Sequence, residues 1–335
     1  MASMPGFAAF LLENNNNMRI MEDMCTICAI ITSTASPETA IPCLNSLQEQ
    51  THRPTHTILL TRTDLAPEKS QELCTMYASI GLIIPDTNDK AHESSGFSTA
   101  FEQLRADFVW LLDSNCTATP NALEELLRAA KDDTICAGLM TISPETAELS
   151  QPIIVETRKN IFAPWKSILK AENLPPRPRI PIRGAWIGAL YPRSVFTRIG
   201  APKKQFSLHN GNDEYAWKAK MQGVGFQLIT SALIHHPPFS AQLIHYCIGG
   251  RSFFYEPGLS PELRYYKIRN WAWIQRLRKP GKPLVRLAFC GFYIILALNA
   301  MLRCGEFHLR DVYTLFRALH NGFYAKLRPY SSRKN

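Results

Sequence analysis

The chain has 335 residues, of which 46% are hydrophobic and 19% charged, and its net charge is +9. This composition is typical of a globular protein with one large domain or two ordinary ones. Nine cysteines without a tight framework, and no cleavable signal at the start, argue against a disulfide-stabilised secreted scaffold and favour a reducing cytoplasm. Cys25 and Cys28 have redox spacing, but their apolar run predicts a first core strand rather than the start of a helix.

Strands and helices are expected to alternate along the first third of the chain. Residues 1–22, with the polar run Asn14–Asn17, predict a poorly ordered leader. The expected strands cover 25–31, 57–60, 81–84 and 108–112, and the expected helices lie around 37–50, 67–80 and 95–105. This alternation calls for right-handed crossovers and a mostly parallel sheet with helices on both faces. Such a sheet is a nucleotide-binding architecture, although a fold alone does not assign a function.

Asp113 directly follows the apolar run 108–112, so it is expected at the carboxyl end of a strand. Thr119 is then expected to cap the next helix, with Pro120 at its first position. Ligands bind at this edge of open α/β sheets, and a carboxylate there can hold a divalent cation against a diphosphate. An acid that only ends a strand or begins a turn is the alternative interpretation.

After residue 144 the alternation breaks. The proline-rich segment 173–182 is expected to be an extended connection, because its prolines exclude a helix. The glycines and apolar residues of 183–191 indicate a strand that a ligand or another backbone approaches closely, or a strand that only packs.

Two further groups of polar residues stand near predicted element ends. Asp213 and Glu214 precede a helix that ends at Gly223, where acids either cap the helix or supply a catalytic carboxylate. His235 and His236 end a short apolar strand. A histidine there is either structural or, beyond a carboxylate pair, the residue that completes a metal site.

The C-terminal region is strongly basic. From Arg264 to the end, 15 Lys and Arg stand against Glu306 and Asp311 only, a balance of +13 that leaves about −4 for the rest. The uncharged stretch 287–302 is shorter than the ~20 residues that a membrane crossing needs. It predicts a helix that lies in a membrane interface or on a partner, with a buried core helix as the alternative. The mixture of cations with bulky apolar residues suits an anionic lipid surface, and no nucleic-acid-binding motif is present.

The order of these pieces resembles the family 2 glycosyltransferases, most closely the rhamnosyl- and galactofuranosyl-transferase branch that builds bacterial surface polysaccharides. The resemblance covers most of residues 25–275. It is carried by 25–32 with 42–51, by Gly96-Phe97, by 110–115, by 188–200, by 211–215, by His236 and by 265–270. No single motif is specific for the family, but the number and order of the motifs together are specific for it.

The resemblance implies a GT-A fold, in which a nucleotide-sugar-binding, mostly parallel sheet is flanked by helices. The glycosyltransferase domain would cover 23–262, with a nucleotide half at 23–120 and an acceptor half at 121–262. Residues 263–335 would form a basic amphipathic helical region on a membrane. The protein would then be cytoplasmic and peripheral on the inner face of the cell membrane, in an oligomeric state that the sequence does not indicate.

The resemblance also implies an inverting transfer from a nucleotide-diphosphate sugar to a glycan or polyprenyl-linked acceptor, with Mn²⁺ or Mg²⁺ as cofactor. Asp113, Asn115 and His236 would bind the metal, and Asp213 or Glu214 would be the catalytic base. Thr32, Thr61 and Gly96 would contact the donor. Arg269 would either assist the diphosphate or only dock its helix.

Several site positions differ from the residues that are usual in the family. Ser114 and Asn115 stand where acids are common, and a neutral ligand binds a divalent ion more weakly than a carboxylate does. In the family, an acid followed by an aromatic residue stands after an Asp-Asp pair. When Glu214 is aligned with that acid, Gly211 and Asn212 fall on the positions of the pair. Asp213 then serves as the base only if the loop shifts by one residue. Three interpretations stay open: an active enzyme, a catalytically silent relative that binds a sugar nucleotide, a glycan or a partner enzyme, and a nucleic-acid binder that uses the basic tail.

Overall fold

The protein is described from a computed structural model, which covers residues 25–33, 37–61, 65–85, 93–156, 165–206, 210–238, 244–248, 251–278 and 283–324. The leader expected at 1–22 lies outside these residues.

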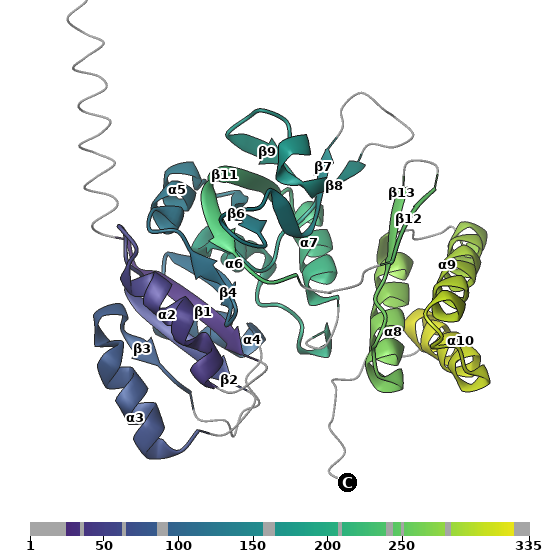
Figure 1. Cartoon of the computed structure of the whole chain (residues 1–335), viewed down its shortest axis with the longest axis horizontal. Helices are drawn as coiled ribbons and strands as arrows, with labels where there is room; N and C mark the ends of the chain where they lie inside the picture. Colours follow the sequence, from purple (N-terminus) through teal and green to yellow (C-terminus); the bar gives the residue numbers. More distant parts are fainter. Residues whose placement is uncertain are drawn as a thin grey trace, which may run out of the picture.

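A mixed sheet forms the body of the molecule (Figure 1). In spatial order its main strands are β3 (Leu82–Ile83), β2 (His56–Thr61), β1 (Ile27–Ser33), β4 (Phe108–Asp113), β10 (Ala189–Pro192), β6 (Thr134–Thr141), β11 (Gly225–His235) and β5 (Thr117–Ala118). β7 (Glu148–Glu156) pairs with β6 and with β8 (Trp165–Lys170), and β9 (Arg179–Pro181) pairs with β11. The expected α/β architecture is confirmed.

The first four strands are parallel, as the alternating pattern predicts. β1 lies between β2 and β4, and β2 pairs with β3, all in parallel. β10 enters antiparallel to both β4 and β6, and β6 pairs in parallel with β11. Because both faces of the central strands are covered, they are continuous apolar runs, and residues 109–112 of β4 are fully buried.

Helices cover both faces of the sheet. One face packs against α2 (Ile41–Gln48), α3 (Pro67–Met76) and α5 (Ala122–Ala129). The other packs against α4 (Glu93–Ser98) with the π-helical turn Thr99–Gln103, α6 (Arg193–Ile199) and α7 (Gly211–Met221). Successive side chains of β1 alternate between these two cores, as the pleat of a strand requires. Short 3₁₀ turns lie at Pro37–Ala40, Ala78–Ile80, Ala171–Asn173 and Lys204–Phe206.

The strand expected at 183–191 is shorter than the sequence indicates, because only Ala189–Pro192 is a strand. Gly188 just before it has φ 76°, in the left-handed region that favours glycine. Its amide donates a hydrogen bond to the Leu111 carbonyl at 2.7 Å. A Cβ at this position would lie 3.0 Å from Ile234 Cδ1. The glycine therefore permits the close approach of neighbouring strands. Residues 173–182 form the expected extended connection, which ends in β9.

The C-terminal region has its own small core. It contains the hairpin β12 (Ile244–Ile248) and β13 (Arg251–Tyr255), followed by α8 (Pro261–Arg278), α9 (Pro283–Arg303) and α10 (Leu309–Tyr324) (Figure 1). Tyr255 packs in the same cluster as buried residues of all three helices, so the hairpin packs with the helices beyond the domain boundary expected at 262. Within the described part of the chain, no helix has both the length and the apolarity needed to span a membrane.

Candidate functional site

Several predicted site residues lie at one edge of the sheet. β1, β2 and β4 are parallel, and β6 and β11 point the same way as β4 because β10 is antiparallel to both β4 and β6. The carboxyl ends of these strands therefore meet at one edge, which is where open α/β sheets bind ligands. This edge carries Thr32, Thr61, Asp113 and the pair His235-His236.

Thr32 supports the turn that follows Asp113. The two residues are paired in register on β1 and β4. Thr32 Oγ1 donates a hydrogen bond to the Leu112 carbonyl at 3.3 Å, and the Thr32 carbonyl accepts one from the Ser114 amide at 2.9 Å. Thr61, at the end of β2, is buried. Both threonines thus lie near the carboxyl ends of neighbouring parallel strands, and their contact with the donor stays a prediction.

Asp113, Asn115 and His236 meet, although His236 is 123 residues from Asp113 in sequence. Asp113 Oδ1 accepts hydrogen bonds from the backbone amide and the side-chain Nδ2 of Asn115, each at 2.9 Å. His236 Nε2 lies 3.4 Å from the same oxygen. His236 is buried, and its backbone is held by Thr141 and Ser150.

The protonation of this group follows from its partners. His236 Nδ1 lies against the Pro237 carbonyl, and its Nε2 faces the Asp113 carboxylate. Burial raises the pKa of Asp113, but the hydrogen bonds and charge of His236 and the hydrogen bonds from Asn115 outweigh it and hold the pKa below its usual value. Asp113 is therefore ionised at neutral pH.

These three residues offer a divalent cation a carboxylate, an imidazole and an amide. They fit a cation that keeps part of its water shell, but they are a weaker set than several carboxylates would be. Among the residues described here, no group of three or more His, Cys, Asp or Glu side chains lies close enough to hold a metal ion.

Asp213 and Glu214 are adjacent in sequence but lie in different environments. The Asp213 side chain is 43% exposed, with Arg278 Nη2 at 3.6 Å and Asn210 Nδ2 at 3.4 Å from its two oxygens. The Glu214 side chain is 1% exposed, and Lys203 Nζ lies 3.1 Å from its Oε1. Neither Glu214 oxygen accepts a hydrogen bond within the described ranges. Only Asp213 is therefore accessible to a substrate.

Gly96 and Arg269 make packing contacts. A Cβ on Gly96 would lie 3.0 Å from Leu60 Cδ1, so the glycine lets α4 approach β1 and β2 closely. The Arg269 guanidinium is buried, lies 4.6 Å from the centre of the Tyr266 ring and donates to the Gln205 carbonyl at 3.1 Å. Tyr266 lies on α8 itself, so the hydrogen bond to Gln205 is the contact that docks α8 on the segment before α7. A contact of either residue with the donor stays a prediction.

The sequence did not single out Lys203 and Arg278, the cations that face the two acids. Lys203 comes eleven residues before Glu214, and Arg278 ends α8 in the next structural unit. A buried acid indicates that a cation lies nearby. The sequence around the acid does not show which cation it is when the two residues are on different elements.

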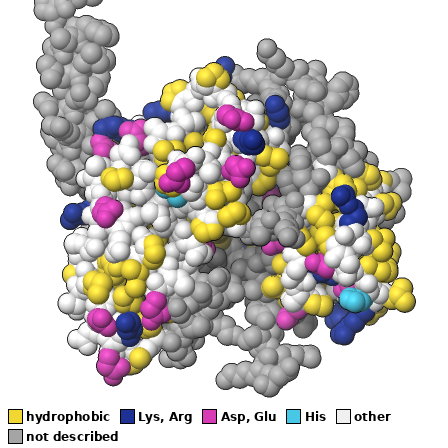
Figure 2. Space-filling model, in the orientation of Figure 1, with side chains coloured by type: hydrophobic (Ala, Val, Ile, Leu, Met, Phe, Trp, Pro, Cys, Tyr) yellow, Lys and Arg dark blue, Asp and Glu magenta, His cyan; other side chains and the backbone are white. Residues whose placement is uncertain are grey.

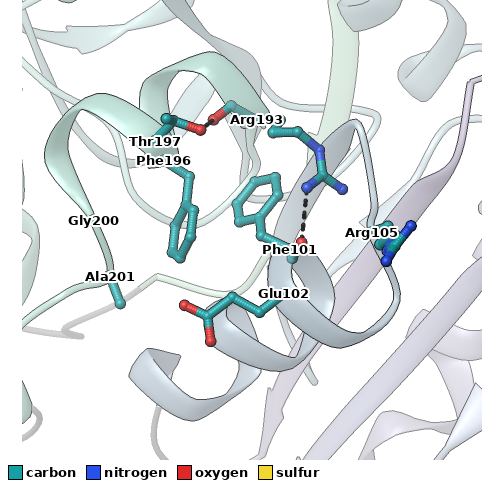
Figure 3. Close-up of a pocket in the computed structure, with 8 residues that line it drawn as sticks. All are labelled: Phe101, Glu102, Arg105, Arg193, Phe196, Thr197, Gly200 and Ala201. Atoms are coloured by element: carbon teal, nitrogen blue, oxygen red, sulfur yellow. Dashed lines mark hydrogen bonds between the residues drawn. The ribbon is translucent and has the colours of Figure 1, made fainter.

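A separate hollow of about 620 Å³ lies at the opposite edge of the sheet, where β4 begins and β10 ends (Figure 3). The rings of Phe101 and Phe196 stack in it at 4.6 Å, and Arg193 Nη1 donates to the Phe101 carbonyl at 2.8 Å. None of the predicted site residues lines this hollow.

Comparison with known proteins agrees with this architecture. Residues 28–199, about half of the chain, match the model of glycosyl transferase family 2. No match was found among curated proteins.

Solved structures with a similar fold include glycosyltransferase complexes. GalNAc-T7 with UDP, GalNAc and Mn²⁺ is 13% identical, with a TM-score of 0.51 over 75% of this chain and 47% of that one. TarS 1-349 of S. aureus in complex with UDP-GlcNAc is 10% identical, with a TM-score of 0.53 over 90% of this chain and 81% of that one. A longer S. aureus TarS is 12% identical, with a TM-score of 0.51 over 90% and 49%.

At these identities the likeness shows the fold alone, and the chain spans about half the length of GalNAc-T7 and of the longer TarS. The family match covers the strands that carry Thr32, Thr61 and Asp113, and the sheet has the arrangement of the GT-A glycosyltransferases. The chain belongs to glycosyl transferase family 2.

Proposed function

We propose that this protein is an active, inverting glycosyltransferase that moves a sugar from a nucleotide-diphosphate donor to a hydroxyl of a glycan or a polyprenyl-linked acceptor. The observation that carries the proposal is the ionised Asp113 at the carboxyl edge of the sheet, in contact with His236 Nε2 and Asn115. The proposed role in bacterial surface polysaccharide synthesis, and the rhamnosyl- or galactofuranosyl-transferase branch, rest on the order of the sequence motifs.

Asp113, Asn115 and His236 would hold Mn²⁺ or Mg²⁺. When bound, such a cation neutralises the charge that develops on a departing diphosphate. The contact of His236 Nδ1 with the Pro237 carbonyl orients the ring with Nε2 towards Asp113. Mn²⁺ accompanies UDP in the GalNAc-T7 structure, which supports the same class of cofactor for this chain.

Asp213 is the proposed base, because a base must reach the acceptor and Glu214 is buried. Its carboxylate takes the proton of the acceptor hydroxyl while that oxygen bonds to the anomeric carbon. The bond from the anomeric carbon to the diphosphate oxygen breaks in the same step, and the nucleotide diphosphate leaves with the electron pair. Arg278, 3.6 Å from Asp213 Oδ1, positions the carboxylate.

The catalytically silent relative remains the second candidate, since Asp113 is the only acid of the proposed metal-binding group. Calorimetry with nucleotide diphosphates, with and without Mn²⁺, together with an assay of nucleotide-diphosphate release from a panel of sugar donors, separates the two. We expect metal-dependent binding that Asp113→Ala abolishes and that the exposed surface control Glu172→Ala leaves intact. Binding without turnover on any donor and acceptor supports the silent relative. An absence of nucleotide binding refutes the enzyme.

The proposed location is peripheral, on the inner face of the cell membrane. It rests on the positive balance of the region after residue 263.

A further inference from the structure

The outer face of α10 is apolar and yet exposed. Leu309, Tyr313, Phe316 and Tyr324 are 83%, 67%, 58% and 78% exposed. Their spacing of four, three and eight residues places them on one side of the helix, where exposed His320 lies between Phe316 and Tyr324. The stripe that they form extends for about 22 Å along the helix axis. Four large apolar side chains in one row are more than the scattered exposed residues of an ordinary surface.

This stripe cannot turn into the protein core, because the opposite face of α10 is already packed. Leu315, Ala318 and Leu319 are buried in the C-terminal cluster. Gly322 lies so close to α8 that an added Cβ would overlap the Arg269 carbonyl and lie 2.7 Å from Ala272 Cβ. The rotation of α10 about its axis is therefore set by its contact with α8, and the stripe faces outwards.

The charges around the stripe are positive. Arg303, Arg310 and Arg317 are exposed. The only acids after residue 264, Glu306 and Asp311, both turn inwards to Arg264, each with an oxygen 3.1 Å from its guanidinium. Figure 2 shows hydrophobic side chains together with Lys and Arg, a His and a few Asp or Glu side chains over the C-terminal helices, at the right of the view.

We propose that the outer face of α10 binds an anionic lipid surface. Leu309, Tyr313, Phe316 and Tyr324 enter the boundary between headgroups and acyl chains, and the arginines bind lipid phosphates. A second copy of this chain is a poorer occupant, because a two-fold contact through this face would bring like-charged arginines together. The inference deepens the proposed location, and it does not depend on turnover at the sheet edge.

The test uses the full chain and sedimentation with vesicles of neutral phosphatidylcholine, with or without anionic phosphatidylglycerol. We expect the wild type to bind the anionic vesicles. Tyr313→Ser with Phe316→Ser should lower the partition coefficient at least about tenfold, since two aromatic side chains leave the lipid. Arg310→Gln should lower it about fivefold on anionic vesicles only. The matched control is Met76→Ser with Met221→Ser, two exposed apolar residues on the other domain, which should bind like the wild type.

Thermal unfolding and size-exclusion chromatography of every variant complete the experiment. Loss of vesicle binding with an unchanged unfolding temperature supports the proposal. Unchanged vesicle binding by the Tyr313/Phe316 variant overturns it. A wild type that binds neutral and anionic vesicles equally also overturns it. The proposal is also overturned if the wild type is a dimer that the Tyr313/Phe316 variant dissociates, because the outer face of α10 would then join two copies of the chain. Nucleotide binding by the wild type in the same preparation shows separately whether the proposed enzymatic function holds.

Discussion

The ion pair of Lys203 and Glu214 should respond asymmetrically to loss of either partner. Glu214 is fully buried, whereas the Lys203 side chain is 40% exposed and its Nζ lies 3.1 Å from Oε1 and 4.6 Å from the centre of the Trp273 ring. Lys203→Met leaves a carboxylate in the interior. Glu214→Gln leaves an ammonium that water can still solvate. The first change should therefore cost much more stability than the second.

The magnitude follows from the burial of the two groups. Removing one partner of a fully buried ion pair costs about 3–5 kcal/mol. Solvent screening at Lys203 and the nearby ammonium of Lys218, whose pKa burial lowers and Glu214 raises, reduce that figure. We expect Lys203→Met to lower the free energy of unfolding by about 2 kcal/mol. Glu214→Gln should change it by less than about 1 kcal/mol, and the double variant should recover most of the loss.

Urea denaturation measures these differences, as shifts of the midpoint at constant slope. The matched control is Lys170→Met, which breaks an exposed pair with Glu172 at 3.9 Å and should cost less than about 0.5 kcal/mol. The reasoning is refuted if Lys203→Met costs no more than this control, or if Glu214→Gln costs more than Lys203→Met. Either result would mean that Glu214 is not a buried charge held by Lys203.

Three other perturbations test the site and the packing. Asp213→Asn should lower turnover about 10²–10⁴-fold while nucleotide binding persists, and Glu214→Gln should lower it far less, as judged by parallel kinetics and calorimetry. Gly322→Ala should destabilise the contact of α10 with α8 by about 1–3 kcal/mol, seen in thermal unfolding, whereas Gly291→Ala on α9, where nothing lies within 4 Å, should not. The pKa of Asp113 in the folded state lies below the unfolded value of about 3.9, so ionised Asp113 stabilises the folded state. This contribution is complete at a pH above about 3.9 and is lost as the pH falls through the lowered pKa. The stability difference between the wild type and Asp113→Asn should therefore shrink as the pH falls below about 3.9. A difference that is independent of pH in this range would contradict the assignment.

The sequence predicted the first four strands well because their signal is local. A strand buried on both faces is a continuous apolar run, as in β4, and an amphipathic helix repeats its apolar residues with the period of the helix. These patterns also located Asp113 at the end of its strand, and parallel pairing then placed Thr32 and Thr61 at the same edge.

By itself, the sequence determined the alternation of strands and helices, the position of Asp113 and the basic, apolar character of the C-terminal region. Tertiary structure decided which distant side chains meet. Asp113 contacts His236 because β4 and β11 end at one edge of the sheet, a consequence of strand pairing that no local pattern contains. Asp213 is exposed and its neighbour Glu214 is buried because adjacent helical residues point in directions about 100° apart, and the packing of α7 selects one of them. In the same way, the contact with α8 rather than the composition of α10 decides which apolar residues face outwards.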